Sequence, residues 1–225
     1  MLCCYFTQGD RRCQRKGRQP VDRKEIRGRF APSPSGRMHL GNLFAALLAW
    51  LDVRRLGGTM VLRMEDLDPE RCREAFAVQL AEDLDWLGLD WDEGYGVGGG
   101  YGPYRQSRRT ERYAACFARL AVQHRVYPCY CSRAERLAAS APHRGDNRDL
   151  YGGRCRRLTP EERAGYEAGG RRPAWRIAVP DETVSFSDGV RGARAEHLPT
   201  GCGDFILRRA DGVYAYQLAA AADDG

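Results

Sequence analysis

The strongest constraint on the fold is a repeated order of strand and helix between residues 26 and 87. Ile26–Phe30 has the pattern of a short strand start, and Thr59–Met64 has that of a buried strand. The loop Ala31–Arg37 and the helical pattern His39–Gly58 separate them, and a second amphipathic pattern, Arg73–Leu87, follows. Strands that alternate with helices in this way favour an α/β fold with a parallel sheet and covering helices.

Apolar residues recur at helical spacing in both helical patterns. They are Leu43, Leu47, Trp50 and Leu51 in the first pattern, and Phe76, Leu80, Leu84 and Leu87 in the second. Steps of three and four residues place such side chains on one face of a helix. Gly57 and Gly58 end the first pattern, as glycine commonly does after a helix. We therefore expect two helices, each with an apolar face.

Composition and charge exclude several classes of protein. The 225 residues are 43% hydrophobic and 29% charged, which allows a sizeable core and excludes a chain that is disordered throughout. The longest apolar run, Leu43–Leu51, is too short to cross a membrane, and the N-terminus lacks the pattern of a secretory signal. We therefore expect a soluble, cytoplasmic protein.

Residues 1–25 hold seven Arg and Lys against three Asp and Glu, so most of the net charge of +6 lies on a basic tail that we expect to be disordered.

The later part of the chain contains an interruption of this pattern. Arg108–Gln123 predicts a third helix, and the glycine-rich segment 94–102 predicts an exposed, mobile loop. That segment is not interpreted as a dinucleotide-binding motif, because it neither follows a clear strand nor opens a helix. Short strand-like runs then alternate with many Arg, Gly and Pro residues. The predicted parts are the tail (1–25), the first half of the α/β domain (26–125), an inserted subdomain (126–196) and an incomplete return to the first domain (197–225).

The junction between the first strand and the first helix has the chemistry of an anion site. A helix N-terminus presents unpaired N–H groups and the positive end of the dipole, which favours phosphate or carboxylate there. Gly41 allows a ligand to approach the backbone, and His39 and Asn42 can donate hydrogen bonds to phosphate or ribose oxygens. The alternative is that His39 is only a residue at the start of a helix, and His-x-Gly alone does not decide between the two.

Three of the nine cysteines have the spacing of metal ligands. An odd number of cysteines in a cytoplasmic chain argues against a disulfide framework. Cys129 and Cys131, one residue apart, can hold one ion from a tight turn, and Cys155 supplies a third thiolate. His143, between them in the sequence, is by general chemistry a better zinc ligand than a tyrosine. The alternative is three unrelated buried cysteines.

Five segments, in order, resemble the glutamate branch of the class I aminoacyl-tRNA synthetases. RFAPSPSGRMHLGNLFAALLAW resembles the nucleotide-binding "HIGH" region, with Asn42 at its last position, and LRMEDLDPER resembles the second signature of that branch. QSRRTERYAACFARL and VYPCYCSR resemble the helix and turn that follow, and GDFILRRADGVYAYQLA resembles the re-entry into the catalytic fold. Several motifs in the correct order are more specific than one. The resemblance covers residues 26–225 and implies a Rossmann-like catalytic domain with an inserted zinc-binding subdomain.

The resemblance also implies a reaction and a set of site residues. Glutamate would be activated with ATP and Mg²⁺ as glutamyl-adenylate, and the acyl group would then pass to an RNA hydroxyl. His39 and Asn42 are implied as catalytic residues, and both are implied to bind ATP together with Gly41. The residues implied to bind glutamate are Arg29, Phe30, Ala31, Pro32, Ser33, Glu65 and Tyr216.

General chemistry agrees with two of these roles, while simpler interpretations exist for others. Arg29 suits a substrate carboxylate because a guanidinium binds it in bidentate fashion, and Glu65 suits the α-amino group of an amino acid. Without the resemblance, Glu65 is interpreted as a cap of the following helix. Likewise, Tyr214 and Tyr216 are alternate residues of a strand and are interpreted as core residues.

Within the glutamate branch, the chain resembles a shorter type of enzyme more than the full-length type that charges tRNA(Glu). The shorter type lacks the anticodon-binding domain and glutamylates queuosine in the anticodon of tRNA(Asp). Cys129-Tyr-Cys131 with Tyr151-Gly-Gly-Arg-Cys155 resembles its zinc motif, which implies Tyr151 as the fourth ligand. Ala220 stands where the longer enzyme usually has Asn. The implied partners are Zn²⁺, glutamate, ATP and tRNA(Asp) with queuosine, and the implied state is a monomer.

The end of the chain limits the activity that we expect. The lysine-bearing "KMSKS" loop and a second substrate-binding Arg of the family come after Gly225, so the chain is C-terminally truncated relative to the family. We therefore expect it to activate glutamate feebly or not at all. Two other functions stay open at this point: the catalytic part of an enzyme that charges tRNA(Glu), and a non-catalytic remnant that binds zinc and RNA.

Overall fold

The computed structural model describes residues 26–132, 135 and 150–225. The chain divides into two compact units: Met1–Thr110 with Asp223–Gly225, which we call the parallel unit, and Glu111–Ala222, which we call the cysteine unit. The expected basic tail and His143 lie outside the described residues. The two units are divided at 110/111 and 222/223, and the predicted domain boundaries at 125/126 and 196/197 stay predictions. In the described part of the chain, no helix is both long and apolar enough to cross a membrane.

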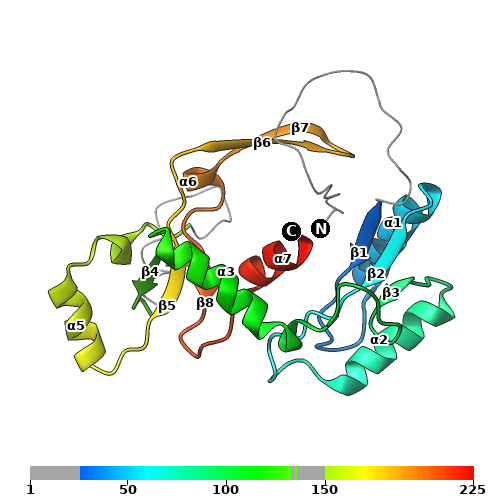
Figure 1. Ribbon diagram of the computed structural model, residues 1–225, viewed down its shortest axis with the longest axis horizontal. Helices are drawn as coiled ribbons and strands as arrows, with labels where there is room; N and C mark the ends of the chain where they lie inside the picture. The colour runs from blue at the N-terminus through cyan, green and yellow to red at the C-terminus, as the bar shows by residue number, and fades with distance from the viewer. Residues whose placement is uncertain (1–25, 133–134, 136–149) are drawn as a thin grey trace. The chain divides into compact units, whose positions relative to one another are not determined.

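The parallel unit has the expected α/β fold (Figure 1). Its strands are, in sheet order, β1 (Arg27–Phe30), β2 (Thr59–Leu62) and β3 (Glu93–Gly94). Its helical elements are α1 (Leu40–Arg55), α2 (Glu74–Trp86) and the 3₁₀ turn η1 (Gln106–Arg108). Both strand pairings are parallel, with Phe30 opposite Leu62 at the end of the first pair. Parallel neighbours require a crossover connection, and α1 and α2 provide it.

Helix α1 packs on the sheet through small residues. Its buried residues are Ala46, Ala49 and Val53. Leu47 and Leu51 are exposed, so the expected apolar face is wrong for these two residues, whereas Trp50 packs against the core as expected. The physical reason is a close approach of helix and strand, since a Cβ at Gly28 of β1 would lie only 2.1 Å from Cγ2 of Val53. Helix α2, in contrast, buries Leu80 and Leu84 as expected.

The glycine-rich segment is partly built into the sheet. Gly94 is the second residue of β3, has a φ of 126°, and a Cβ there would lie 2.1 Å from the carbonyl oxygen of Leu62. Its N–H donates to the carbonyl oxygen of Gly98 at 2.8 Å, which closes a turn. The prediction of an exposed loop is confirmed for residues 96–102 and wrong for Gly94, because the backbone approaches β2 too closely there for any side chain.

The cysteine unit is built on an antiparallel sheet and a separate hairpin. In sheet order, the strands are β4 (Val126–Cys129), β5 (Ala174–Ile177) and β8 (Ile206–Arg208). The hairpin consists of β6 (Thr183–Asp188) and β7 (Gly192–His197). The helical elements are α3 (Thr110–Val122), η2 (Arg154–Arg157), α5 (Pro160–Ala168), α6 (Leu198–Gly201) and α7 (Tyr216–Asp224). The expected strand-like runs of the insertion therefore form strands.

The segment after Tyr214 differs from the expected strand. Tyr214 is buried, and its ring meets the rings of Tyr113 and Phe117 with centroids 6.1 Å and 6.2 Å away. Tyr216 instead begins α7 and is 40% exposed. Ala219–Ala222 follow, and alanine has the highest helix propensity of all residues. An alternation of two tyrosines is too short to outweigh that run, so the core interpretation holds for Tyr214 only.

Candidate active site and metal centre

His39 and Asn42 cap the N-terminus of α1. His39 is the N-cap, and its Nδ1 accepts a hydrogen bond from the N–H of Gly41 at 3.1 Å. Asn42 Oδ1 accepts from the N–H of His39 at 3.2 Å. These two bonds show which side-chain groups remain available as donors. A neutral His39 then carries its proton on Nε2, and Asn42 keeps its amide NH₂ group as a donor. The first turn holds no acidic residue, so the positive end of the helix dipole is not neutralised within the helix.

The residues that follow β1 and β2 lie together at the carboxyl edge of the sheet. The N–H of Arg63 donates to the carbonyl oxygen of Phe30 at 3.1 Å, and the N–H of Glu65 donates to that of Pro32 at 2.9 Å. The predicted residues Phe30–Ser33 and Glu65 are therefore brought together. Carboxyl ends of parallel strands are where open α/β sheets commonly bind ligands.

Arg29 is held in place by an acidic residue from the far end of the chain. Its Nε donates to Oδ1 of Asp224 at 2.6 Å, and its Nη2 donates to Oδ2 of the same carboxylate. Burial acts to raise the pKa of Asp224, but the hydrogen bonds from Arg29 and Arg63 outweigh it and hold the pKa below its ordinary value. The two parallel bonds fix the plane of the Arg29 guanidinium.

Arg63 connects this pair to Glu65. Its Nη1 donates to Oδ1 of Asp224 at 2.7 Å, and its Nη2 donates to Oε1 of Glu65 at 3.2 Å. The side chains of Arg63 and Glu65 are each only 5% exposed. Burial raises the pKa of Glu65 above its ordinary value, although Arg63 acts in the opposite direction. The positive charge of Arg63 thus favours the ionised form of Glu65, which burial disfavours.

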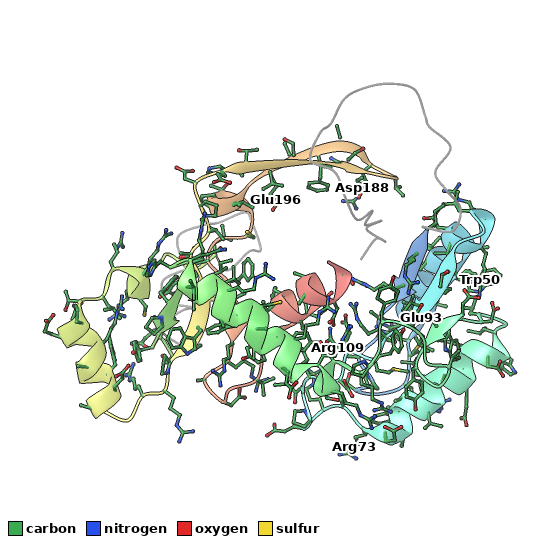
Figure 2. The ribbon with its side chains drawn as sticks, viewed as in Figure 1. Trp50, Arg73, Glu93, Arg109, Asp188 and Glu196 are labelled. Carbon is green, nitrogen blue, oxygen red and sulfur yellow. The ribbon has the colours of Figure 1, made fainter. Side chains whose placement is uncertain are left out.

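Asp223 extends the same arrangement. Its fully buried carboxylate accepts hydrogen bonds from Nη1 of Arg109 at 2.7 Å and from Nε2 of Gln106 at 3.0 Å; Arg109 is labelled in Figure 2. The six charged residues, which we call the buried charge network, are Arg29, Arg63, Arg109, Glu65, Asp223 and Asp224. Three positive charges thereby meet three negative charges.

Most members of the network escaped the sequence analysis, although one signal was present. Arg63 interrupts an apolar strand pattern, and a charge in a buried strand requires a partner. The partners Asp223 and Asp224 are 160 residues or more away in the sequence, where no local pattern points to Arg63. Tyr216 belongs to the cysteine unit, so its place beside Arg29 stays a prediction.

The three expected cysteines form one cluster within the cysteine unit. Their sulfur atoms all lie within 4.8 Å of one another, with 3.4 Å between Cys131 and Cys155. The hydroxyl oxygen of Tyr151 lies 3.5 Å from the sulfurs of both Cys129 and Cys131, and it accepts a hydrogen bond from the N–H of Cys155 at 2.9 Å. The alternative of three unrelated buried cysteines is therefore wrong.

The donor set fits a tetrahedral metal ion. Zinc–sulfur bonds of about 2.3 Å place two sulfurs of a tetrahedral site about 3.8 Å apart, close to the separations in this cluster. The strand β4 ends at Cys129, and Gly153, with a φ of 72°, precedes the turn η2 that carries Cys155. The end of β4 and the turn η2 thus bring the thiols of Cys129 and Cys155 close together.

A buried arginine lies next to this cluster. The guanidinium carbon of Arg176 is 3.9 Å from the centre of the Tyr151 ring, and Arg176 as a whole is 4% exposed. Burial acts to raise the pKa of Cys129, but the contacts with Tyr151, the backbone of Cys131 and Arg176 together lower it. For Cys131, burial raises the pKa to about 11, and the neighbouring Cys155 acts in the same direction.

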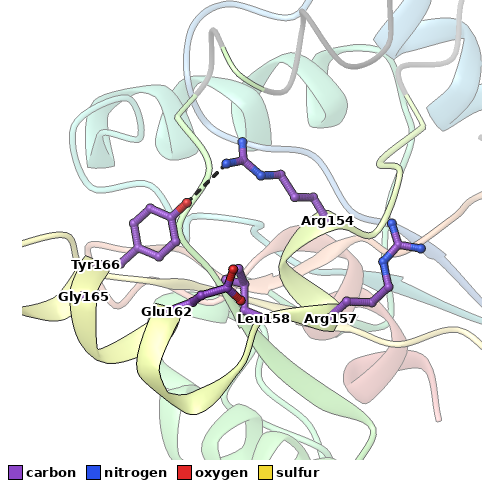
Figure 3. A pocket seen from close by; sticks show the side chains of 6 residues that line it. All are labelled: Arg154, Arg157, Leu158, Glu162, Gly165 and Tyr166. Carbon is purple, nitrogen blue, oxygen red and sulfur yellow. Dashed lines mark hydrogen bonds between the residues drawn. The ribbon is translucent and has the colours of Figure 1, made fainter.

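The surface of the cysteine unit also carries an open hollow beside the cluster. Figure 3 shows this hollow of about 520 Å³, lined by Arg154, Arg157, Leu158, Glu162, Gly165 and Tyr166. Arg154 donates from Nη2 to the hydroxyl of Tyr166 at 3.3 Å. The ring of Tyr166 stacks on that of Tyr130, with 5.1 Å between centroids. Exposed arginines beside a stacked aromatic pair suit a phosphate-bearing ligand.

Comparison with known proteins defines the class to which these features belong. The family model described as "tRNA synthetases class I (E and Q), catalytic domain" matches residues 25–225. The chain belongs to this family, and the expected class I synthetase catalytic domain is confirmed.

Individual relatives are similar over the same region. The chain is 55% identical over 200 residues to a protein named glutamyl-Q tRNA(Asp) synthetase from Symbiobacterium thermophilum, covering 88% of this chain and 61% of that protein. It is 54% identical to a protein of the same name from Nitratidesulfovibrio vulgaris, covering 62% of it. A glutamate–tRNA ligase from Symbiobacterium thermophilum is 46% identical, with 42% of its length covered. The chain thus spans about three fifths of the length of the first two relatives.

Solved structures give the same result for the fold. The crystal structure of a glutamate tRNA ligase from Elizabethkingia meningosepticum in complex with its amino acid has a TM-score of 0.71 at 31% identity, covering 87% of this chain and 41% of that chain. The enzyme from Elizabethkingia anophelis has a TM-score of 0.73 with the same coverage.

Proposed function

We propose that this chain supplies the glutamate and ATP sites of an enzyme that activates glutamate and transfers it to queuosine of tRNA(Asp). The observation that carries the proposal is the identity of 54–55% to two proteins named glutamyl-Q tRNA(Asp) synthetase, compared with 46% to a glutamate–tRNA ligase. The arrangement at the carboxyl edge of the parallel sheet supports it, because Arg29 and Glu65 belong to one hydrogen-bonded network there.

In the proposed reaction, the α-carboxylate of glutamate attacks the α-phosphorus of ATP. The bond from this phosphorus to the bridging oxygen breaks, and pyrophosphate leaves. We assign the start of α1 to the phosphates, with donors at Nε2 of His39 and the side-chain amide of Asn42. The N–H of Gly41 is engaged by Nδ1 of His39, so Gly41 would instead let the nucleotide approach the backbone. Mg²⁺, when bound to the nucleotide, would neutralise further phosphate charge. In the second step an RNA hydroxyl attacks the acyl carbon, and AMP leaves.

For the amino acid, we assign Arg29 to the side-chain carboxylate and Glu65 to the α-ammonium group. The two hydrogen bonds that Arg29 donates to Asp224 orient its guanidinium before substrate arrives. Glu65 is desolvated, and an ammonium ion beside it would favour its ionised form. Phe30, Ala31, Pro32 and Ser33 are proposed to shape the pocket, and Tyr216 to close it.

We further propose that Cys129, Cys131, Cys155 and Tyr151 hold a zinc ion. Thiolates suit zinc, and all four donor atoms converge on one point. The ion would have a structural role, since it would join the end of β4 to η2. His143 as an alternative fourth ligand stays a prediction, because it lies outside the described residues.

The amino acid assignment is tested by calorimetric titration of glutamate in the presence of a non-hydrolysable ATP analogue. Replacing Arg29 (Arg29→Met) should weaken glutamate binding by about tenfold or more, the worth of a charge-assisted hydrogen-bond pair. Arg27→Met is the matched control, because Arg27 lies on the same face of β1 and pairs with Glu93 instead. Equal affinities of the two variants would contradict the assignment.

The acceptor is tested with radiolabelled glutamate, ATP and Mg²⁺. We expect label on tRNA(Asp) that contains queuosine and none on tRNA(Asp) that lacks it. Label on the 3′ end of tRNA(Glu) would instead favour an enzyme that charges tRNA(Glu). Binding of tRNA without any activation of glutamate would favour a non-catalytic binding protein.

A further inference from the structure

Arg176 is a buried cation that forms no salt bridge with a carboxylate of the described residues. It is 4% exposed, and its Nη1 donates to the backbone carbonyl of Asp204 at 2.6 Å rather than to the carboxylate. That carboxylate is bonded to the hydroxyl of Tyr127 at 2.6 Å and to the N–H of Val179 at 2.9 Å. Among the carboxylates of the described residues, Arg176 has no salt-bridge partner, and its Nε has no hydrogen-bond partner there either.

The sheet register places Arg176 on the same face as the metal cluster. Arg176 of β5 is directly opposite Tyr127 of β4 in the antiparallel pair. Opposite residues of such a pair share one face of the sheet, and so do residues two apart along a strand. Arg176, Tyr127 and Cys129 therefore share a face, and Tyr151 lies against the guanidinium at 3.9 Å.

A buried cation is costly unless an anion faces it. The neighbours that can carry a negative charge are the carboxylate of Asp204, which bonds Tyr127 and Val179 instead, the thiols of the cluster and the hydroxyl of Tyr151. Three thiolates around one Zn²⁺ leave a net charge of −1, and a phenolate ligand would make it −2. We propose that Arg176 is the counter-ion of this metal–thiolate centre and thereby strengthens zinc binding. The inference rests on the zinc site proposed above.

The charge of Arg176 can be separated from its hydrogen bond by two substitutions. Both Arg176→Lys and Arg176→Gln retain a donor for the carbonyl of Asp204, but only lysine retains the positive charge. Zinc affinity is measured by competition with a chromogenic chelator, after the zinc content of the wild-type protein has been determined. We expect the zinc dissociation constant to rise by about 10- to 100-fold for Arg176→Gln, the usual effect of removing an outer partner of a metal site, and by much less for Arg176→Lys.

A matched control is available on the adjacent strand. Arg208 of β8 lies over the ring of Tyr214, with its guanidinium carbon 5.6 Å from the ring centre. Arg208→Gln should therefore leave zinc affinity unchanged. If Arg176→Lys and Arg176→Gln weaken zinc binding equally, or if neither does, the counter-ion role is wrong, and Arg176 has only a structural role. Wild-type protein that binds no zinc overturns the metal site itself, which is a separate result.

A second measurement tests whether Arg176 acts through the charge of the centre. Cys155→His would replace one anionic ligand by a neutral one, so the centre would carry one negative charge fewer. In that background, Arg176→Gln should weaken zinc binding by a smaller factor than in the wild-type background. An equal factor in both backgrounds would show that the two sites are not coupled through charge.

Discussion

The two units of the chain both bury arginine side chains, but they neutralise them in different ways. In the parallel unit, Arg63 and Arg109 are paired with carboxylates of the same unit, and the network sums to zero charge. In the cysteine unit, Arg176 has no carboxylate partner among the described residues and lies beside a cysteine cluster. The first arrangement is electrically complete with protein groups alone, whereas the second is completed by a thiolate-bound metal ion in our proposal.

The difference predicts which external conditions each unit responds to. A network of paired side chains depends on the ionisation of its carboxyl groups, and hence on pH. A metal–thiolate centre depends on the free metal concentration, because binding energy for the ion is also folding energy. A chelator should therefore lower the stability of the cysteine unit. A change in the ionisation of Glu65 should change the stability of the parallel unit.

The largest expected effect is the loss of the metal centre. Cys155→Ser, or an excess of a chelator on the wild-type protein, should remove zinc and destabilise the cysteine unit by several kcal/mol, since structural zinc contributes on the order of 10 kcal/mol in small domains. Hydrogen exchange should show lost protection in β4 and β5 and unchanged protection in β1 and β2. Cys116→Ser is the matched control, because Cys116 is a half-buried thiol of α3 outside the cluster. Equal loss of protection in all four strands would contradict the prediction that zinc stabilises the cysteine unit alone.

The second effect is the removal of the central cation of the buried charge network. Arg63→Met leaves Asp224, Glu65 and Asp223 without a shared partner, and breaking a buried ion pair costs about 3–5 kcal/mol. Urea unfolding followed by tryptophan fluorescence measures this in a Trp175→Phe background, since the other tryptophans all belong to the parallel unit.

The control for this experiment is a surface ion pair of the same unit. Arg54 pairs with Asp90 and Asp92, both largely exposed, so Arg54→Met should cost about 1 kcal/mol or less. The loss from Arg63→Met should also persist when zinc is chelated. If chelation of zinc abolishes the loss of stability caused by Arg63→Met, the charges of the two units are coupled, which would contradict this prediction.

The features predicted from sequence are those with a short-range pattern. The alternation of strands and helices, the helix start near His39, and the close pair Cys129 and Cys131 are each set by residues only a few positions apart in the sequence. Two features that join more distant residues could also be predicted. The repeated order of strands and helices predicted the parallel sheet, and a family motif predicted the cluster with Cys155.

The features that were missed depend on contacts between distant segments. Asp224 meets Arg29 from 195 residues away, and no periodicity predicts that contact. The leucines of α1 are more hydrophobic than its alanines, yet the helix buries Ala46, Ala49 and Val53, and Gly28 leaves room for the side chain of Val53. Arg176 resembles any surface arginine in sequence, and it is buried on β5, the strand between β4 and β8.

The smallest of the three effects is the pH dependence that Glu65 confers on the parallel unit. Burial raises the pKa of Glu65 above its ordinary value of 4.5, so the folded state binds this proton more readily than the unfolded state does. The stabilisation is then fully present below pH 4.5 and is lost as the pH rises through the folded pKa. Relative to Glu65→Gln, which cannot titrate, the wild-type protein should become less stable as the pH rises from about 4 to 7.

Glu74 provides a control of opposite sign. It is exposed on α2, and the hydrogen bond from Arg105 lowers its pKa, so its stabilisation is present above its ordinary pKa of 4.5 and is lost as the pH falls. Relative to Glu74→Gln, the wild-type protein should therefore gain stability with rising pH. Both curves follow from urea unfolding in the Trp175→Phe background, and neither should change when zinc is chelated. Parallel curves for wild type and Glu65→Gln would show that Arg63 fully offsets the burial of Glu65, so that both units compensate their buried charges completely.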